Sequence, residues 1–335
     1  MYFHCKSNIM NKIDLKDRKI LYELDQDSRQ SLSQIGKKVG VAKSIVSYRI
    51  NRLQKLGIIK SYYTVVDLYK LGFIAPRFHF VYQYVTPDME KKIIDYFISN
   101  KYTFIVVSTY GPFDLSVLFG LRDIRKLYAI WQEIQSKFGY YFEKQSLGFY
   151  LNEIHLPLTY LVDGKKRGQV HRRLQLSSSQ DMIQLDEIEL KILNKLSSNS
   201  QMPLIEIGKE LQLSARQVSY RIKKLIQSQV IEGFRIEVDI HKLGFEDYKT
   251  YIFLKEFNLR NKIIDYIIQN PHLICIDTTT GESHLELEFH FPSIEHLHST
   301  MQDIQEKFPN AIRNYYHVSV KKCYKWLYLP EFLHR

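Results

Sequence analysis

Two copies of one pentapeptide carry side chains suited to an anionic partner. Val46-Ser47-Tyr48-Arg49-Ile50 recurs 172 residues later as Val218-Ser219-Tyr220-Arg221-Ile222. In each copy the valine and the isoleucine are four residues apart and fit a buried helix face, whereas serine, tyrosine and arginine are left to donate hydrogen bonds. A helix fits the DNA major groove, where such side chains reach base edges and arginine neutralises phosphates. The motif therefore predicts a nucleic-acid-binding helix that occurs twice.

The residues around each motif extend this chemistry. No Asp or Glu occurs in 42–56 or in 214–229. The candidate DNA contacts are the polar and basic residues off the apolar stripe or at its edge: Lys43, Ser44, Ser47, Tyr48, Arg49, Arg52 and Lys55 in the first copy, and Ser214, Arg216, Gln217, Ser219, Tyr220, Arg221, Lys223 and Lys224 in the second. The alternative is a structural helix with a solvated basic face. Two acid-free copies favour the DNA-binding interpretation.

Three short helices and a strand are predicted to position each motif. Asp14 opens the first helix with an acidic turn, and Ser31 is the expected N-cap of the second. Ser214 caps the third helix of the second copy, where the first copy has Ala42. This order predicts a winged helix-turn-helix in each copy, with recognition helices 42–56 and 214–227 followed by a wing or hairpin over 58–66 and 230–238.

A second module, also duplicated, follows each helix-turn-helix unit. Its first copy alternates predicted strands and helices in the order β-α-β-β-α-β, over 77–85, 88–99, 103–110, 113–119, 122–138 and 144–154. This order predicts a ferredoxin-like sheet with two helices on one face, and Trp131 is expected on the inner face of the second helix. The fold class is therefore α+β.

The duplication divides the chain into alternating units joined by a basic linker that we expect to be solvated. The expected organisation is an N-terminal tail 1–13, winged helix-turn-helix units 14–73 and 185–245, βαββαβ domains 74–159 and 246–330, and a basic, Ser-rich linker 160–184.

Charge is unevenly distributed between the halves. The chain has a net charge of +11, and residues 1–167 hold all of the excess, with 26 Lys and Arg against 15 Asp and Glu. Residues 14–73 carry +6, but the matching residues 186–245 carry only +1. We therefore expect the first unit to dominate non-specific DNA affinity, which depends on phosphate neutralisation.

Several other classes of protein are not supported. No run of about 18 apolar residues and no secretory signal is present, and three widely spaced cysteines suggest reduced thiols, so we expect a cytoplasmic, nucleoid-associated protein without a membrane partner. Nucleotide-binding and hydrolase motifs are also missing from the sequence. The sequence predicts no enzyme activity, no cofactor and no metal site; the histidines at 284, 290, 296 and 298 lack a third ligand of fixed geometry.

The sequence resembles the Lrp/AsnC transcriptional regulators, fused head to tail. The helix-turn-helix part of the resemblance rests on Asp14, Asp17, Ile20-Leu21, Ser28-Arg29, Ser31-Leu32, Ile35-Gly36, Val46, Arg49-Ile50, Leu53, Gly57-Ile58-Ile59 and Leu71-Gly72. The run from Thr109 to Leu115 is similar to a loop of that family's ligand-sensing domain. The resemblance implies a transcription regulator with an amino-acid-like effector at Gly111, Asp114 and Gly281, and an intrachain pseudo-dimer that could assemble further into a homo-oligomer on double-stranded DNA.

Two alternatives remain open at this point. Siroheme decarboxylases look similar, with a helix-turn-helix-like segment followed by a related αβ domain. They carry a histidine within an Arg- and Tyr-Asn-Trp-rich strand, and here the stretch 281–289 offers His284 alone. A DNA-architectural or partner-binding scaffold without sequence readout is the second alternative, and competition against random DNA would separate it from a specific regulator.

Overall fold

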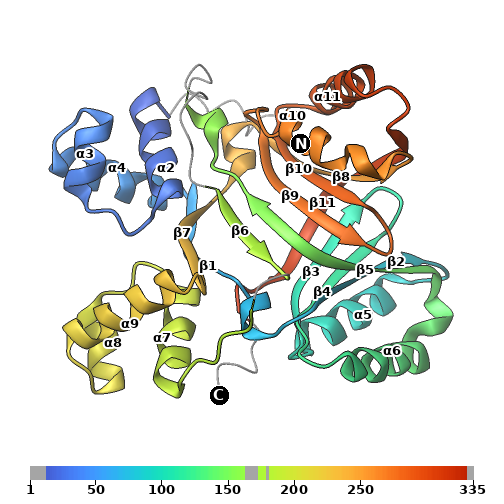
Figure 1. The fold of residues 1–335 in the computed structure, drawn as a ribbon, viewed down its shortest axis with the longest axis horizontal. Coiled ribbons are helices and arrows are strands. Elements are labelled where there is room, and N and C mark those ends of the chain that lie inside the picture. The colour runs from blue at the N-terminus through green and yellow to red at the C-terminus, as the bar shows by residue number, and fades with distance from the viewer. Residues whose placement is uncertain (1–12, 163–172, 179–180, 330–335) are drawn as a thin grey trace.

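The two copies of the duplicated sequence fold as one intertwined pair (Figure 1). A computed structural model describes residues 13–162, 173–178 and 181–329. Both helix-turn-helix units lie on one side of the molecule, and the two βαββαβ modules lie together on the other (Figure 1). Among the described residues, no helix is long and apolar enough to cross a membrane.

Each helix-turn-helix unit is a bundle of three short helices. The helices are α2 (Leu15–Gln26), α3 (Leu32–Val39) and α4 (Lys43–Lys55) in the first unit, and α7 (Glu187–Ser198), α8 (Leu204–Leu211) and α9 (Ala215–Gln227) in the second. Val46, Ile50 and Leu53 are buried, as predicted from their spacing. Ser31 accepts a hydrogen bond from the Gln34 amide as the N-cap of α3, which confirms the predicted helix start.

The strand after each recognition helix pairs with the other copy. β1 (Ile59–Val66) and β7 (Ile231–Val238) form an antiparallel two-stranded sheet in which Tyr62 lies opposite Ile236. The predicted extended segments are therefore confirmed, but they build a shared ribbon instead of a hairpin within each unit. After each strand the chain turns at Gly72 or Gly244, which have left-handed backbone conformations, and continues into the βαββαβ module. Because the chain does not fold back beside the strand, the strand of the other copy is its pairing partner.

The βαββαβ order is present in both copies. The first copy consists of β2 (Ala75–Tyr82), α5 (Pro87–Ser99), β3 (Thr103–Tyr110), β4 (Leu115–Phe119), α6 (Ile124–Phe138) and β5 (Phe142–His155). The second consists of β8 (Glu246–Leu254), α10 (Arg260–Ile267), β9 (Leu273–Thr280), β10 (Leu285–Phe291), α11 (Ile294–Lys307) and β11 (Ile312–Trp326). In the first copy, Phe80, Phe97 and Ile134 join sheet and helices in a buried cluster, which accounts for the alternating pattern.

The two sheets close into a single barrel. The strand order is β2-β4-β3-β11-β8-β10-β9-β5, and β5 returns to pair with β2. The last strand of each copy makes the seam, because β5 pairs with β9 and β11 pairs with β3. A closed sheet leaves no edge among these eight strands, so the fold satisfies within one chain the contact that a dimer would otherwise make.

Two details differ from the sequence predictions. Residues 174–177 of the expected solvated linker form a strand, β6 (Leu174–Ser177), which pairs with β5 and buries Leu174 and Leu176. Apolar residues alternate with polar ones over this short strand, but the residues around it are basic and Ser-rich, which is why a solvated linker was predicted. Trp131 was expected to face inward but is 41% exposed, because it lies at the edge of the α6 stripe and stacks on Tyr128. The basic residues 165–167 and 172 lie outside the described residues.

Candidate nucleic-acid interface

The two recognition helices present the candidate DNA contacts unequally to solvent. Tyr48 and Tyr220 are 66% and 71% exposed and project furthest from the buried stripe. Other exposed candidates are Lys43, Ser44, Lys55, Ser214, Arg216, Gln217, Lys223 and Lys224. The half-buried candidates are Ser47, Arg49, Arg52, Ser219 and Arg221. The structure therefore separates the predicted set into outward side chains and side chains that also hold the unit together.

Arg49 is held by the start of the first helix. Its guanidinium lies 2.7 Å from an Asp14 carboxylate oxygen and 2.9 Å from Asp17, and Arg52 also pairs with Asp17, whose side chain is fully buried. Although burial opposes the shift, hydrogen bonds from the Asp17 amide and from Arg49 lower the pKa of Asp14. The hydrogen bond with Asp14 raises the pKa of Arg49. The recognition helix is thus fixed to α2 by charges that are partly neutralised before any DNA is bound.

The second unit repeats this ionic latch between the recognition helix and the first helix of the unit, with Glu189 in place of Asp17 and Lys224 in place of Arg52. Arg221 pairs with Asp186 at 2.5 Å, and Lys224 pairs with Glu189 at 2.6 Å. Lysine replaces the arginine of the first copy at position 52, so a contact from one guanidinium nitrogen, Nη2 of Arg52, becomes a contact from an ammonium group. The hydrogen bond with Glu189 raises the pKa of Lys224. Both helices are therefore positioned by the same pair of interactions at equivalent positions.

The caps of the two recognition helices differ as the sequence predicts. Ser214 and Gln217 form a capping box, in which Gln217 N donates to Ser214 Oγ at 3.2 Å and Ser214 N donates to the side-chain Oε1 of Gln217 at 2.8 Å. Ala42 makes no side-chain cap. Two candidate contacts of the second helix are consequently engaged at its N-terminus, whereas Lys43 and Ser44 of the first helix are exposed.

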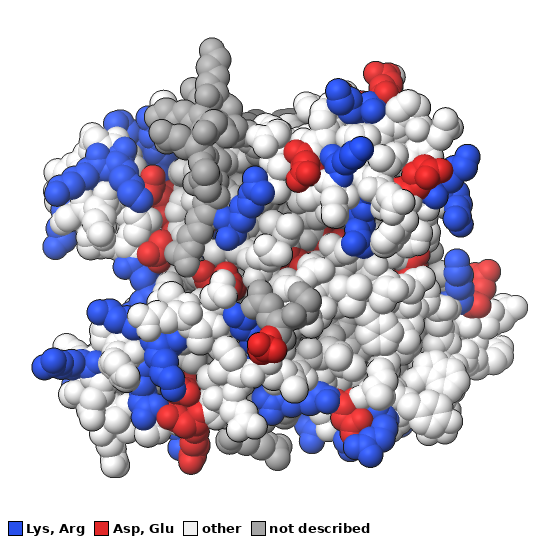
Figure 2. Space-filling model, viewed as in Figure 1, with Lys and Arg blue, Asp and Glu red and all other residues white. Residues whose placement is uncertain are grey.

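Positive side chains lie over both helix-turn-helix units. Figure 2 shows Lys and Arg side chains on the side where these units lie, with acidic side chains beside them, and further Lys and Arg over the barrel modules. The acids at the start of α2 and α7 belong to the latches described above. The exposed surface of the recognition helices is therefore basic and suited to phosphate contacts.

Two of the three predicted effector residues, Gly111 and Gly281, lie at the seam of the barrel. Gly111 has φ 145° and passes close to β11, since a Cβ there would lie 3.0 Å from the His317 carbonyl oxygen. Gly281 has φ 103°, and a Cβ there would lie 2.5 Å from the Leu147 carbonyl oxygen. The Asp114 carboxylate accepts a hydrogen bond from the Tyr82 amide at 2.8 Å. Gly111 and Gly281 thus pass close to the other copy at different strands, whereas Asp114 makes its contact within the first copy, and the structure does not bring Gly111 and Gly281 into one site.

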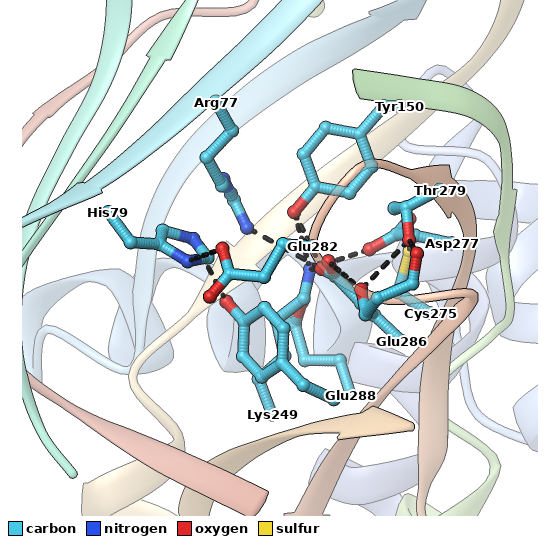
Figure 3. A network of polar contacts seen from close by, with 12 residues as sticks. Arg77, His79, Tyr150, Lys249, Cys275, Asp277, Thr279, Glu282, Glu286 and Glu288 are labelled. Atoms are coloured by element: carbon cyan, nitrogen blue, oxygen red, sulfur yellow. Dashed lines mark hydrogen bonds and ion pairs between the residues drawn. The ribbon is translucent and has the colours of Figure 1, made fainter. Parts of the chain in front are cut away.

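A buried polar network inside the barrel was not predicted (Figure 3). Arg77 of the first copy lies over the Tyr150 ring, and the Tyr150 hydroxyl donates to Glu286 of the second copy at 2.8 Å. Lys249 lies 2.6 Å from Asp277 and 3.1 Å from Glu286. One feature of the sequence could have indicated this network. Charged residues occupy alternate positions of β8 and β10, and the first copy has mainly small or apolar residues at the matching positions.

Histidines of the second copy have structural partners. His284 Nδ1 accepts a hydrogen bond from the Leu254 amide at 3.0 Å, and His290 Nδ1 lies 2.7 Å from the Tyr160 hydroxyl. Burial lowers the pKa of His290 to about 3. Within the described ranges, no group of three or more His, Cys, Asp or Glu side chains is arranged to hold a metal ion.

Comparison with known proteins matches the two units separately. A model for winged helix-turn-helix DNA-binding domains matches residues 13–60 and again 185–232. The HTH-type transcriptional regulator LrpA of Bacillus subtilis is 33% identical over 132 residues, which cover 36% of this chain and 90% of that protein. The regulator Ptr1 of Methanocaldococcus jannaschii is 42% identical over 99 residues, covering 29% of this chain and 66% of its own length.

A solved structure matches the whole arrangement. The siroheme decarboxylase NirDL superposes with a TM-score of 0.64 at 12% sequence identity, covering 94% of each chain. At this identity the likeness concerns the fold alone.

Proposed function

Because this chain belongs to the Lrp/AsnC family of transcriptional regulators and carries two of their units in tandem, we propose that it binds two DNA half-sites with α4 and α9. It is a DNA-binding transcription regulator. Sequence-specific binding through the major groove would use the exposed polar and basic residues of both helices. The observation that supports this proposal is that the two recognition helices are presented by one scaffold, in which the β1–β7 ribbon and the closed barrel join the two copies.

The pairing matters because helix-turn-helix dimers read half-sites whose spacing reflects protein symmetry. The contacts between the copies are themselves repeated: Lys70 Nζ donates to the Ser228 carbonyl oxygen, and Lys242 Nζ donates to the Leu56 carbonyl oxygen. Each lysine thus reaches the C-terminal cap of the other copy's recognition helix. We expect the two half-sites to have similar sequences at the base pairs contacted by the repeated Ser-Tyr-Arg residues. We also expect the first unit to bind the DNA phosphates more strongly than the second.

The experiment is selection of bound genomic fragments with the purified protein, followed by fluorescence anisotropy on the selected duplex and on random DNA. The variants are Tyr48→Ala and Tyr220→Ala, with Tyr84→Ala as the matched control, since Tyr84 is an equally exposed tyrosine of the barrel module. A lost base contact costs about 1–3 kcal/mol, so each recognition-helix variant should bind the selected duplex about tenfold more weakly. Equal affinity of the unmodified protein for selected and random DNA would instead support an architectural scaffold.

We further propose that the chain is not an enzyme and that an amino-acid-like effector modulates DNA binding through the barrel modules. The family provides the support for both statements, and the position of Gly111 and Gly281 at the contact between copies offers a route from an effector to the relative placement of α4 and α9. Repeating the DNA selection with amino acids added tests the effector. Addition of siroheme, followed by absorbance in the Soret region, tests the enzyme alternative; a bound and converted tetrapyrrole would overturn the non-enzyme proposal.

A further inference from the structure

A large cavity lies where the barrel meets the β1–β7 ribbon. Its volume is about 560 Å³, which falls within the range of roughly 300–1,000 Å³ typical of small-molecule sites. The ribbon covers it with residues such as Val65 and Ile236, and strands of both copies form the opposite wall. Neither the predicted DNA contacts nor the predicted effector residues line this cavity.

The two copies contribute walls of opposite character at equivalent positions. Ala75 and Leu118 line the cavity from the first copy, and their counterparts at offsets of 172 and 170 are Asp247 and Glu288, which line it from the second copy. Around the first pair the wall is apolar, with Phe104, Ile105 and Val107. At these positions the wall is apolar in the first copy and carries carboxyls in the second, and the cavity lining also includes Lys60, Arg235, Lys321 and Lys322.

The carboxyls of the second copy outnumber the cations next to them. Lys249 is shared among three carboxylates, at 2.6 Å from Asp277, 3.1 Å from Glu286 and 3.8 Å from Glu288. Arg77 adds one further cation, 3.8 Å from Glu286. Asp247, on the strand next to Glu288, is a fourth carboxyl in this group, so Lys249 and Arg77 face four carboxyls. Of the other charged residues that line the cavity, Arg235 pairs with Asp25 and His155 pairs with Glu153. Burying carboxylates is costly unless positive charge compensates them.

The titration of these acids agrees with a shortage of positive charge. Burial, together with repulsion from Glu288, raises the pKa of Asp247 well above its ordinary value. Burial and repulsion from Asp277 likewise raise the pKa of Glu288. A cation bound beside these two carboxyls would therefore favour their ionised forms.

We propose that this cavity binds an organic amine, with the ammonium group between Asp247 and Glu288 and an apolar body against the wall of the first copy. The ammonium group adds positive charge beside the carboxyls that Lys249 and Arg77 only partly compensate. The apolar wall favours an aromatic or aliphatic body, because burying apolar surface stabilises the complex. This site is separate from the predicted effector loops and does not depend on the DNA-binding proposal.

The test uses matched probes with one indole body and three different charges. Tryptamine, the neutral tryptophol and the anionic indole-3-acetate are titrated into the full-length protein at pH 7 by calorimetry, with octylamine as a second, aliphatic amine. The expected result is binding of at least one amine, at least tenfold tighter than the neutral or the anionic probe. Equal binding of the three indole probes, or no binding of either amine at millimolar concentration, would overturn the proposal.

Comparison of the two copies suggests a double variant that tests the proposed amine site. Asp247→Ala combined with Glu288→Leu installs the residues that the first copy already carries at these positions. Removing two uncompensated acids should leave the fold intact, which circular dichroism checks, and amine affinity should fall at least tenfold. Asp265→Ala on the exposed face of α10 is the control and should bind amines normally. A folded double variant with unchanged amine affinity would also refute the site, whereas DNA affinity without amine should stay unchanged in both variants.

Discussion

Ser28 and Ser200 occupy the same position in the two copies, and their hydroxyl groups hydrogen-bond to each other at 2.7 Å. Both side chains are buried. The backbone around them repeats the relationship, because the Ser28 amide donates to the Phe234 carbonyl oxygen and the Ser200 amide donates to the Tyr62 carbonyl oxygen. The paired serines therefore mark the pseudo-twofold relationship between the helix-turn-helix units at the level of single atoms.

This pair predicts a non-additive effect on stability. Ser28→Ala or Ser200→Ala leaves one buried hydroxyl without its partner, which should cost about 1–2 kcal/mol of unfolding free energy. In the double variant no hydroxyl is left unpaired, so its cost should be below the sum of the single costs by about 1 kcal/mol. Urea unfolding measures all three. The exposed Ser44→Ala is the control, and strictly additive losses would show that the two hydroxyls do not interact.

The uneven charge of the two units predicts unequal phosphate contacts. We expect Lys43→Ala with Lys55→Ala to weaken binding to random DNA more than Arg216→Ala with Lys223→Ala. The first unit carries +6 and the second +1 over matching residues, so its local field is stronger. Anisotropy titrations at several salt concentrations give the affinities and the salt slopes. Larger losses in the second unit would contradict the assignment of the main phosphate contacts to the first.

Arg49 was predicted as a DNA contact, and its latch predicts a second effect. Arg49→Ala removes a charge partner of the buried Asp17 and should lower the unfolding free energy by about 1–3 kcal/mol, with the lower part of that range favoured because the guanidinium is 21% exposed. Lys55→Ala, at the exposed end of the same helix, should change stability by less than 0.5 kcal/mol, as is usual for surface substitutions. Thermal unfolding without DNA separates this structural effect from a lost DNA contact.

The buried His290 predicts a pH dependence of stability. Burial lowers its pKa in the folded state to about 3, whereas the unfolded value is about 6.5. Its contribution is therefore fully present above about pH 6.5 and is lost as the pH falls from there to about 3, by at most about 1.4 kcal/mol per pH unit. Urea unfolding between pH 7 and pH 4 should show a shallower loss for His290→Gln than for the unmodified protein. His241→Gln, with an exposed side chain, should keep the original slope.

The seam glycine Gly281 predicts a strong local constraint. In Gly281→Ala the new Cβ would lie 2.5 Å from the Leu147 carbonyl oxygen, at a φ of 103° that alanine rarely adopts. We expect a loss of about 1–3 kcal/mol in unfolding free energy. Gly139→Ala is the matched control, since Gly139 has a right-handed helical backbone and its nearest neighbour is the flexible end of Gln135. Equal losses of unfolding free energy for the two substitutions would mean that the backbone at the seam can shift to accommodate a Cβ at position 281.

Much of the local structure followed from the sequence because it depends on short-range rules. The Val46 and Ile50 spacing, the Ser214 cap and the β-α-β-β-α-β order all involve residues close together in the chain, and the structure confirms each of them. The duplication also indicated that the copies would pair within one chain.

The remaining features depend on which edges and faces meet. The sequence did not predict that β1 would pair with β7 or that β5 and β11 would close the barrel. Strand partners depend on how the elements are arranged in three dimensions, which a local sequence pattern does not contain. The charged residues of β8 were equally hard to interpret, since alternate positions on a strand can face either solvent or a barrel interior. The latch at Arg49 was missed because its partner Asp14 lies 35 residues away.

The head-to-tail fusion has a consequence for how this molecule can change. In a homodimer every substitution appears on both subunits, so an acid placed at the position of Asp247 would face the same acid across the twofold axis. Here Ala75 occupies the first copy and Asp247 the second, and one cavity receives both. Covalent linkage also makes the pairing independent of protein concentration. A single gene can thus vary one half of the shared interior while the other half keeps the packing that closes the barrel.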